Sequence, residues 1–229
     1  MHIPRILAVV LAGGKGSRLG ALTEHRVKPA LPVAGTYRLI DISLSNLVHS
    51  HISDVWLVQQ YLPHTLNDHL ANGRPWDLDR SHGGLRVLPP FEGAEGEGFA
   101  HGNSDSLYRQ RHLIRAFDPE LVLVLSADHL YTINFLDVLD THLAHNADLT
   151  MVVTQTREDP SRFAVVQADG DDVVTGPRMR MKLEDQVGFF EQPAYTMKRV
   201  PQAGSQATAN KAFARSDAAQ VTLFDSVGF

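Results

Sequence analysis

Continuous apolar runs recur along the chain and predict the strands of a buried sheet. Residues 6–11 and 121–125 are apolar throughout, which is typical of central parallel strands that are buried on both faces. A shorter apolar run at residues 55–58 and a mostly apolar stretch at residues 149–154 predict two further strands. The chain therefore carries the strands of at least one substantial sheet.

Apolar residues at helical spacing predict helices between these strands. The helical patterns cover residues 38–50, 65–70, 104–117 and 135–143. Ser104 is placed to cap the third of these helices. Strands that alternate with helices predict an α/β fold with a doubly wound, mainly parallel sheet. In such a sheet, ligands bind at the carboxyl ends of the strands.

The remainder of the chain is less regular. Residues 72–103 are rich in Gly, Pro and Glu, and a loop of that length is either functional or partly disordered. Residues 163–167 and 173–174 predict a hairpin with a turn between them. After Gly176 no alternation of strands and helices is visible, so we expect one domain over residues 1–176 and a divergent tail of unclear structure over 177–229.

A glycine-rich loop follows the first predicted strand. It consists of Leu11-Ala12-Gly13-Gly14-Lys15-Gly16-Ser17-Arg18-Leu19 and leads to Lys28-Pro29-Ala30. Glycines let backbone amides approach phosphate oxygens closely, and the Arg and Lys side chains supply positive charge for a leaving pyrophosphate. The spacing fits neither the GxxxxGK[ST] loop nor GxGxxG. A glycine-rich turn with solvated cations is the alternative interpretation.

An aspartate follows the strand predicted at residues 121–125. Asp128 is a candidate ligand for Mg²⁺, which prefers oxygen ligands and often takes only one or two of them from the protein. A turn or helix-capping role is the alternative for Asp128. His142 and His145 are spaced like a metal-binding pair on a helix, but we expect them to lie on an exposed helix face.

Composition and charge narrow the class of partner. The chain has 26 acidic residues against 21 Lys and Arg, a net charge of −5, and no cysteine. This balance argues against a basic nucleic-acid surface and favours a small-molecule nucleotide, and disulfides and thiolate metal sites are excluded. No apolar stretch is long enough for a signal peptide or a membrane span, so we expect no membrane partner and a cytoplasmic protein.

The glycine loop followed by Lys-Pro-Ala is the signature pattern of sugar nucleotidyltransferases. Residues 37–41 (Tyr-Arg-Leu-Ile-Asp), 44–46 (Leu-Ser-Asn), 60–61 (Gln-Tyr) and 64–66 (His-Thr-Leu) extend the similarity. Through these motifs the chain resembles the glucose-1-phosphate adenylyltransferase (ADP-glucose pyrophosphorylase) family. The resemblance implies a Rossmann-like, GT-A-like nucleotidyltransferase fold. It also implies synthesis of ADP-glucose and pyrophosphate from ATP and glucose 1-phosphate, in glycogen or α-glucan biosynthesis.

The resemblance also implies roles for individual residues. Arg18 and Lys28 would contact the triphosphate as catalytic residues, Asp128 would hold Mg²⁺, and Gln60 would contact the adenine edge. The nucleotide-binding set would be Leu11, Ala12, Gly13, Gly14, Gly16, Gln60, Gly102 and Asp105. Without the family, Gln60 is equally well explained as a polar residue that closes a strand.

The chain departs from the family pattern towards its end. The similarity covers residues 5 to about 176, and the aromatic-Glu-Lys-Pro motif expected there has a displaced counterpart, Phe190-Glu191-Gln192-Pro193, with Gln in place of the sugar-phosphate Lys. We therefore expect a fold that is incomplete at the C-terminus and lacks the family's β-helix, through truncation or a frame shift. Two alternatives stay open: a transferase for another nucleoside triphosphate, and an inactive nucleotide-binding or regulatory homologue. A homo-oligomer also stays open.

Overall fold

The computed structural model describes most of the chain before residue 153 and a few strands after it. The described residues are 4–14, 16–89, 100 and 102–153, with the backbone of 164–168, 174–176, 214–216 and 221–225. For Ser17, Arg18 and Ser104 the backbone alone is described. The predicted motif at Phe190–Pro193 lies outside the described residues.

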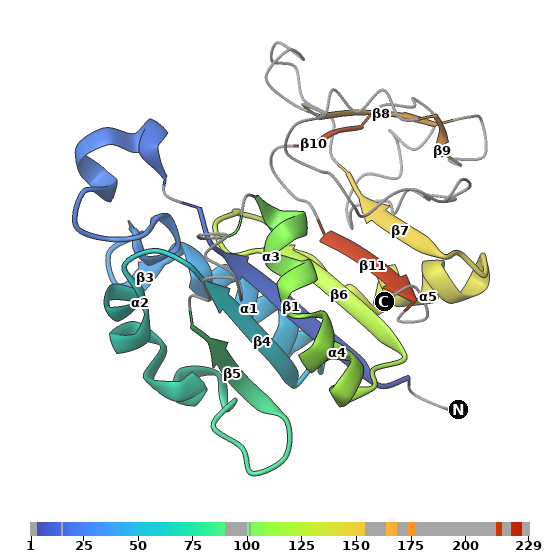
Figure 1. Cartoon of the computed structure of the whole chain (residues 1–229), viewed down its shortest axis with the longest axis horizontal. Coiled ribbons are helices and arrows are strands. Elements are labelled where there is room, and N and C mark those ends of the chain that lie inside the picture. The colour runs from blue at the N-terminus through green and yellow to red at the C-terminus, as the bar shows by residue number, and fades with distance from the viewer. Residues whose placement is uncertain are drawn as a thin grey trace.

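A six-stranded sheet with the order β5-β4-β1-β6-β11-β7 forms the centre of the fold (Figure 1). Its strands are β1 (Ile6–Ala12), β4 (Asp54–Gln59), β5 (Gly84–Leu88), β6 (Leu121–Ser126), β7 (Leu149–Val152) and β11 (Val221–Asp225). Neighbouring strands from β5 to β6 are parallel, whereas β11 is antiparallel to both β6 and β7. The predicted α/β fold with a mainly parallel sheet is confirmed.

Helices cover both faces of this sheet. They are α1 (Leu39–His49), α2 (Pro63–Leu70), α3 (Asn103–Arg109), α4 (Arg111–Phe117) and α5 (Phe135–Ala144), with short 3-10 helices η1 (Ser17–Thr23), η2 (Lys28–Ala30) and η3 (Ala71–Trp76). The predicted helices at α1, α2 and α5 are confirmed. No helix in the described part of the chain is both long and apolar enough to cross a membrane.

The helix predicted over residues 104–117 is wrong in two respects. The structure divides it into α3 and α4 at Gln110, and α3 begins at Asn103, so Ser104 is not its cap. The cap position belongs to Gly102, whose φ of 90° is one that glycine adopts without steric cost.

Two hydrophobic cores fill the space between the sheet and its helices. Alternate residues of β1 point to opposite faces, and Ala8 and Val10 pack with α1 and α5 in one core. Leu7 and Val9 pack with α3 and α4 in the other. Figure 1 shows α3 and α4 in front of the sheet and α1 behind it. This burial on both faces explains why the strand is apolar at every position.

Short strands complete the described structure. β2 (Pro32–Val33) pairs with β3 (Tyr37–Arg38), and β8 (Ala164–Ala168) pairs with both β9 (Val174–Gly176) and β10 (Ala214–Ser216). The antiparallel β8–β9 pair confirms the predicted hairpin. The strands β10 and β11 come from the segment after Gly176, whose structure the sequence left unclear. The proposed boundary at Gly176 stays a prediction.

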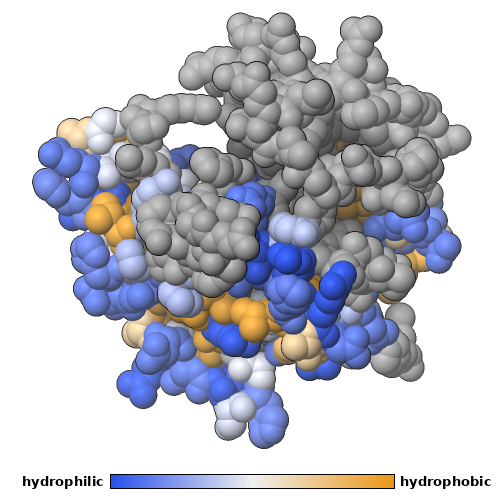
Figure 2. All heavy atoms as spheres, viewed as in Figure 1, coloured by the Kyte–Doolittle hydropathy of each residue, from blue (hydrophilic) through white to orange (hydrophobic). Residues whose placement is uncertain are grey.

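Figure 2 shows one face of the molecule, with the described residues coloured by hydropathy. On the face drawn in Figure 2, hydrophilic residues predominate and hydrophobic ones form limited clusters among them. The large apolar side chains most exposed in the described part include Leu22, Tyr37 and Leu130, which lie in different parts of the chain. Scattered exposed residues of this kind are normal for a folded domain and do not by themselves mark an interface.

Candidate functional site

The site predicted from the sequence lies where β1 and β6 end side by side. The chain leaves β1 towards β4 and β5 on one side and returns to β6 on the other, so the gap between β1 and β6 is the switch point at which such sheets bind ligands. Leu11 pairs with Ser126 across the two strands, and the Ala127 N–H donates to the Leu11 carbonyl at 3.1 Å. The glycine loop and Asp128 therefore emerge next to each other.

Lys28 and Asp128 meet at this edge of the sheet. The Lys28 Nζ lies 2.8 Å from the Asp128 Oδ2, with side-chain exposures of 36% and 22%. The Ser126 hydroxyl donates to the other carboxylate oxygen, Oδ1, at 2.5 Å. Asp128 is thus held from both oxygens while part of it faces solvent.

The surroundings of Asp128 keep its carboxyl ionised. Burial by itself would raise the pKa of this carboxyl, because a charged group loses hydration inside the protein. Hydrogen bonds from Lys28 and Ser126 oppose that effect, and the positive charges of Lys28 and His129 add to them. The pKa of Asp128 consequently lies below its ordinary value of 3.8. A half-buried carboxylate that stays negative is suited to hold a cation.

The glycine loop is tied to the segment that carries Lys28. Gly16 has a φ of 66°, and a Cβ at this position would lie 2.9 Å from the Thr23 Cγ2 and 3.4 Å from the Lys28 Cβ. The Thr23 hydroxyl donates to the Gly16 carbonyl at 2.9 Å. Gly14 is exposed, and a Cβ there would meet no atom within 4 Å. The loop therefore has a fixed end at Gly16 and an open stretch at Gly14, where a phosphate has room.

Gln60 lies against the other side of the loop. A Cβ on Gly13 would come within 3.0 Å of the Gln60 Oε1 and 3.9 Å of the Ser106 Oγ. The Gln60 Nε2 donates to the Ala100 carbonyl at 2.8 Å, and the Ser106 hydroxyl donates to the Gly102 carbonyl at 2.9 Å. The predicted residues Gly13, Gln60 and Gly102 are thus brought into one neighbourhood around the start of α3.

Asp105 has a local partner in the same helix. Both of its carboxylate oxygens accept from the Arg109 Nε at 3.2 Å, and the Arg109 side chain is only 9% exposed. This ion pair stabilises α3 directly after Gly102. The predicted contact of Asp105 with a nucleotide stays a prediction.

The predicted catalytic residue Arg18 is described in its backbone alone, and the expectation for His142 is wrong. Lys15 and the side chain of Arg18 lie outside the described part of the chain.

The two histidines of α5 and its C-cap differ in burial. His142 was expected on an exposed helix face, but it is buried, and its Nδ1 lies 2.9 Å from the Thr150 Oγ1 of β7. His145 is exposed, as expected. Among the described residues, no group of three or more His, Cys, Asp or Glu could hold a metal ion.

Sequence reasoning missed the hydroxyl groups that organise the site. Ser126 and Ser106 hold Asp128 and Gly102 through the hydrogen bonds described above, and Thr23 closes the glycine loop. Ser126 and Ser106 carried a local sequence signal, because each lies within four residues of its partner. Thr23 acts across a turn that the pattern of apolar residues does not reveal.

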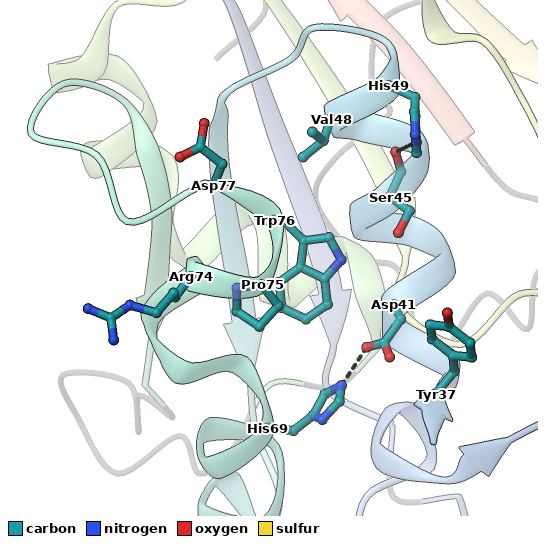
Figure 3. Close-up of a pocket in the computed structure, with 10 residues that line it drawn as sticks. All are labelled: Tyr37, Asp41, Ser45, Val48, His49, His69, Arg74, Pro75, Trp76 and Asp77. Carbon is teal, nitrogen blue, oxygen red and sulfur yellow. Dashed lines mark hydrogen bonds and ion pairs between the residues drawn. The ribbon is translucent and has the colours of Figure 1, made fainter. Parts of the chain in front are cut away.

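A separate cleft lies on the far side of α1 from this site. It has a volume of about 490 Å³ and lies between α1, α2 and η3 (Figure 3). Asp41 lines it and caps α1, accepting from the Arg38 N–H at 2.9 Å, while its other oxygen lies 2.5 Å from the His69 Nε2. None of the predicted nucleotide, catalytic or metal residues lines this cleft.

Comparisons with known proteins agree with this architecture. The sequence profile of the nucleotidyl transferase family, described as "Nucleotidyl transferase", matches residues 7–193. The glucose-1-phosphate adenylyltransferase of Clostridium acetobutylicum is 46% identical over 173 residues, which are 75% of this chain and 46% of that protein. The enzyme of the same name from Thermotoga maritima is 45% identical over 166 residues, 72% of this chain and 39% of that protein. The chain spans less than half the length of these curated relatives.

A solved structure shares the fold. It is a crystal structure of a Bacillus anthracis protein assigned as a glucose-1-phosphate thymidylyltransferase, in complex with a sucrose. The TM-score is 0.67 at 17% identity, with 96% of this chain and 72% of that chain covered. At this identity the likeness concerns the arrangement of strands and helices alone.

Proposed function

This chain belongs to the nucleotidyl transferase family, and from that membership we propose that it forms ADP-glucose and pyrophosphate from ATP and glucose 1-phosphate. The choice of substrates is supported by the curated relatives, which are named glucose-1-phosphate adenylyltransferases. The observation that carries the proposal is the contact between Lys28 and Asp128 at the switch point. It sets one cation and one anion beside a glycine loop that has room for phosphate.

In the proposed reaction, a phosphate oxygen of glucose 1-phosphate attacks the α-phosphorus of ATP. The new phosphorus–oxygen bond forms as the bond to the oxygen bridging the α- and β-phosphates breaks, and the electron pair leaves with pyrophosphate. The attacking oxygen is already ionised, so the reaction needs no general base, and His129 has no proton to remove. Catalysis then depends on positioning and on neutralising the charge that develops on pyrophosphate.

The chain's own groups supply that neutralisation in this proposal. Backbone amides around Gly13 and Gly14 bind phosphate oxygens, as amides of a concave loop do. Lys28 and Arg18 contact the phosphates next to the breaking bond. A preorganised contact of this kind lowers the barrier by ~3 kcal/mol, by analogy with an oxyanion-hole donor.

The residues present fit a magnesium ion that is shared with the nucleotide. Asp128 offers an ionised oxygen ligand, and Mg²⁺ at nucleotide sites commonly takes one or two carboxylates together with phosphate oxygens. Bound there, Mg²⁺ would neutralise phosphate charge and stabilise the leaving pyrophosphate. Ser126 would keep the carboxylate oriented through its hydrogen bond.

Pyrophosphate release tests the proposal directly. The purified full chain is mixed with Mg²⁺, glucose 1-phosphate and, in separate reactions, ATP, UTP, dTTP or GTP. We expect the highest rate with ATP and a strongly reduced rate in Asp128→Asn. A higher rate with another triphosphate would reassign the nucleotide, and absence of MgATP binding by calorimetry and thermal shift would remove the nucleotide site altogether.

A second candidate function is nucleotide binding without catalysis. It is favoured by Gln192, which replaces the Lys of the family's sugar-phosphate motif. A chain of this kind binds MgATP yet releases no pyrophosphate at high glucose 1-phosphate. The cytoplasmic location and the homo-oligomer stay predictions under either function.

A further inference from the structure

Helix α1 and its C-cap, Ser50, turn three buried polar side chains towards the loop that carries Asp128. Ser43, Asn46 and Ser50 are only 0%, 9% and 1% exposed. They lie on the side of α1 opposite to the cleft of Figure 3, because residues three and four apart share a helix face. Buried polar groups are costly unless they are hydrogen-bonded, so their partners indicate what they do.

The first of these side chains acts on the strand end next to Asp128. The Ser43 hydroxyl donates to the Ser126 carbonyl at 3.0 Å. The hydroxyl of the same Ser126 donates to the Asp128 carboxylate. One residue therefore receives a bond from α1 and passes a bond to the carboxylate, which fixes both the direction of the chain and the direction of the Asp128 side chain.

The second side chain fastens the loop after Asp128. The Asn46 Nδ2 donates to the Tyr131 carbonyl at 2.9 Å, and its Oδ1 accepts from the Ile133 N–H at 3.3 Å. One amide thus satisfies a donor and an acceptor of a backbone that belongs to no helix or strand. Alanine can offer neither group.

The third side chain fixes the end of this loop. The Ser50 hydroxyl accepts from the Phe135 N–H at 2.9 Å, where α5 begins. The loop also has apolar support, because Tyr131, Ile133 and Phe135 pack against the core beneath α1. Removal of a single polar contact therefore leaves the loop attached, but free to shift.

We propose that Ser43, Asn46 and Ser50 are positioning residues that hold Asp128 where it meets both Lys28 and the nucleotide-bound metal. This inference rests on the proposed function. The three side chains act through the backbone of residues 126–135 and touch neither substrate nor metal themselves. Groups that orient a metal ligand in this way typically contribute about 10- to 100-fold in metal affinity or activity.

Two measurements on the full chain test the proposal. The first is hydrogen–deuterium exchange of peptides covering residues 126–135, without nucleotide or metal, in Asn46→Ala, Ser43→Ala and Ser50→Ala. The second is titration of the protein with the preformed Mn²⁺–ATP complex, followed through the electron paramagnetic resonance signal of protein-bound Mn²⁺ against an ATP-only blank, without glucose 1-phosphate. Ser45→Ala is the matched control, because Ser45 lies on the same helix but lines the cleft on its other side.

We expect faster exchange across residues 126–135 in Asn46→Ala and about tenfold weaker binding of Mn²⁺, with both values unchanged in Ser45→Ala. Unchanged exchange or unchanged Mn²⁺ affinity in a folded Asn46→Ala overturns the proposal. If Asn46→Ala does not fold, the same outcomes in the serine variants decide it. A wild-type chain that binds no Mn²⁺ with ATP contradicts the proposed function instead. The exchange data then show separately whether Ser43, Asn46 and Ser50 hold residues 126–135 in place.

Discussion

Lys28 and Asp128 come from opposite sides of the β1–β6 switch point and form an ion pair with an N–O distance of 2.8 Å. Lys28 begins η2, beyond the glycine loop, and Asp128 follows β6. Each charge is held beside the glycine loop by the other. In the proposed function both groups also interact with the bound nucleotide. Lys28 contacts a phosphate, and Asp128 coordinates the metal ion.

Lys28→Met should slow pyrophosphate release by about a hundredfold, because removal of one preorganised charge contact costs ~3 kcal/mol of transition-state stabilisation. Steady-state rates at saturating MgATP measure this loss. Arg26→Met is the matched control, since Arg26 is an exposed cation two positions away. A Lys28→Met chain that melts like the wild type and reacts at its rate would remove Lys28 from the machinery.

Asp128 should contribute to stability only above a certain pH. Its folded pKa lies below the ordinary value of 3.8, so the unfolded chain binds the proton more readily. The contribution is therefore present in full above the unfolded pKa and is lost as pH falls through the lower folded value. Urea unfolding of wild type and Asp128→Asn should show a stability difference at pH 6 that shrinks as the pH is lowered below about 4.

Two glycines of the loop should respond differently to the same substitution. Gly16→Ala places a Cβ against Thr23 at a φ of 66°, and should lower the free energy of unfolding by about 1–2 kcal/mol. Gly14→Ala meets no atom, so it should leave stability unchanged and weaken MgATP binding by crowding the phosphate. Thermal melts and calorimetry of both variants separate the two effects. Equal losses of stability would contradict this division of the loop.

The features that were predictable are those imposed by burial on both sides of the sheet. β1 and the first five residues of β6 are apolar at every position, and the residues that follow the two strands had to lie at the ligand-binding edge. That argument placed Asp128 and the glycine loop in one neighbourhood. It needed no knowledge of side-chain contacts.

The features that were missed depend on contacts between distant segments. His142 lies seven residues after Phe135, on the buried face of α5, and the Thr150 hydroxyl on β7 is the distant partner that its ring has there. Asn46 and Ser50 are polar residues within an amphipathic pattern, and only the folded loop shows that they face inward. β11 lies between β6 and β7 because it pairs antiparallel with both of them. Those two strands are distant in the sequence, so the pattern within β11 does not indicate this position.

Gln60 should determine part of the preference for the nucleotide base. Its Nε2 donates to the Ala100 carbonyl and its Oε1 faces Gly13. The amide is therefore oriented beside the glycine loop, where an adenine edge can form a hydrogen bond with it. Gln60→Ala should reduce kcat/KM for ATP by about tenfold or more, because a buried hydrogen-bonding group of the base then has no partner.

Comparing kcat/KM for ATP and UTP separates two roles of Gln60: contact with the base, and a hydrogen bond that only fastens the backbone at Ala100. If Gln60 contacts the base, kcat/KM falls more for ATP than for UTP, and Gln60→Glu, which keeps the length but lacks the amide donors, behaves like Gln60→Ala. If Gln60 only fastens the backbone at Ala100, all triphosphates lose equally. An equal loss would assign Gln60 to the alternative role of a polar residue that closes β4, and base recognition would have to come from another part of the chain.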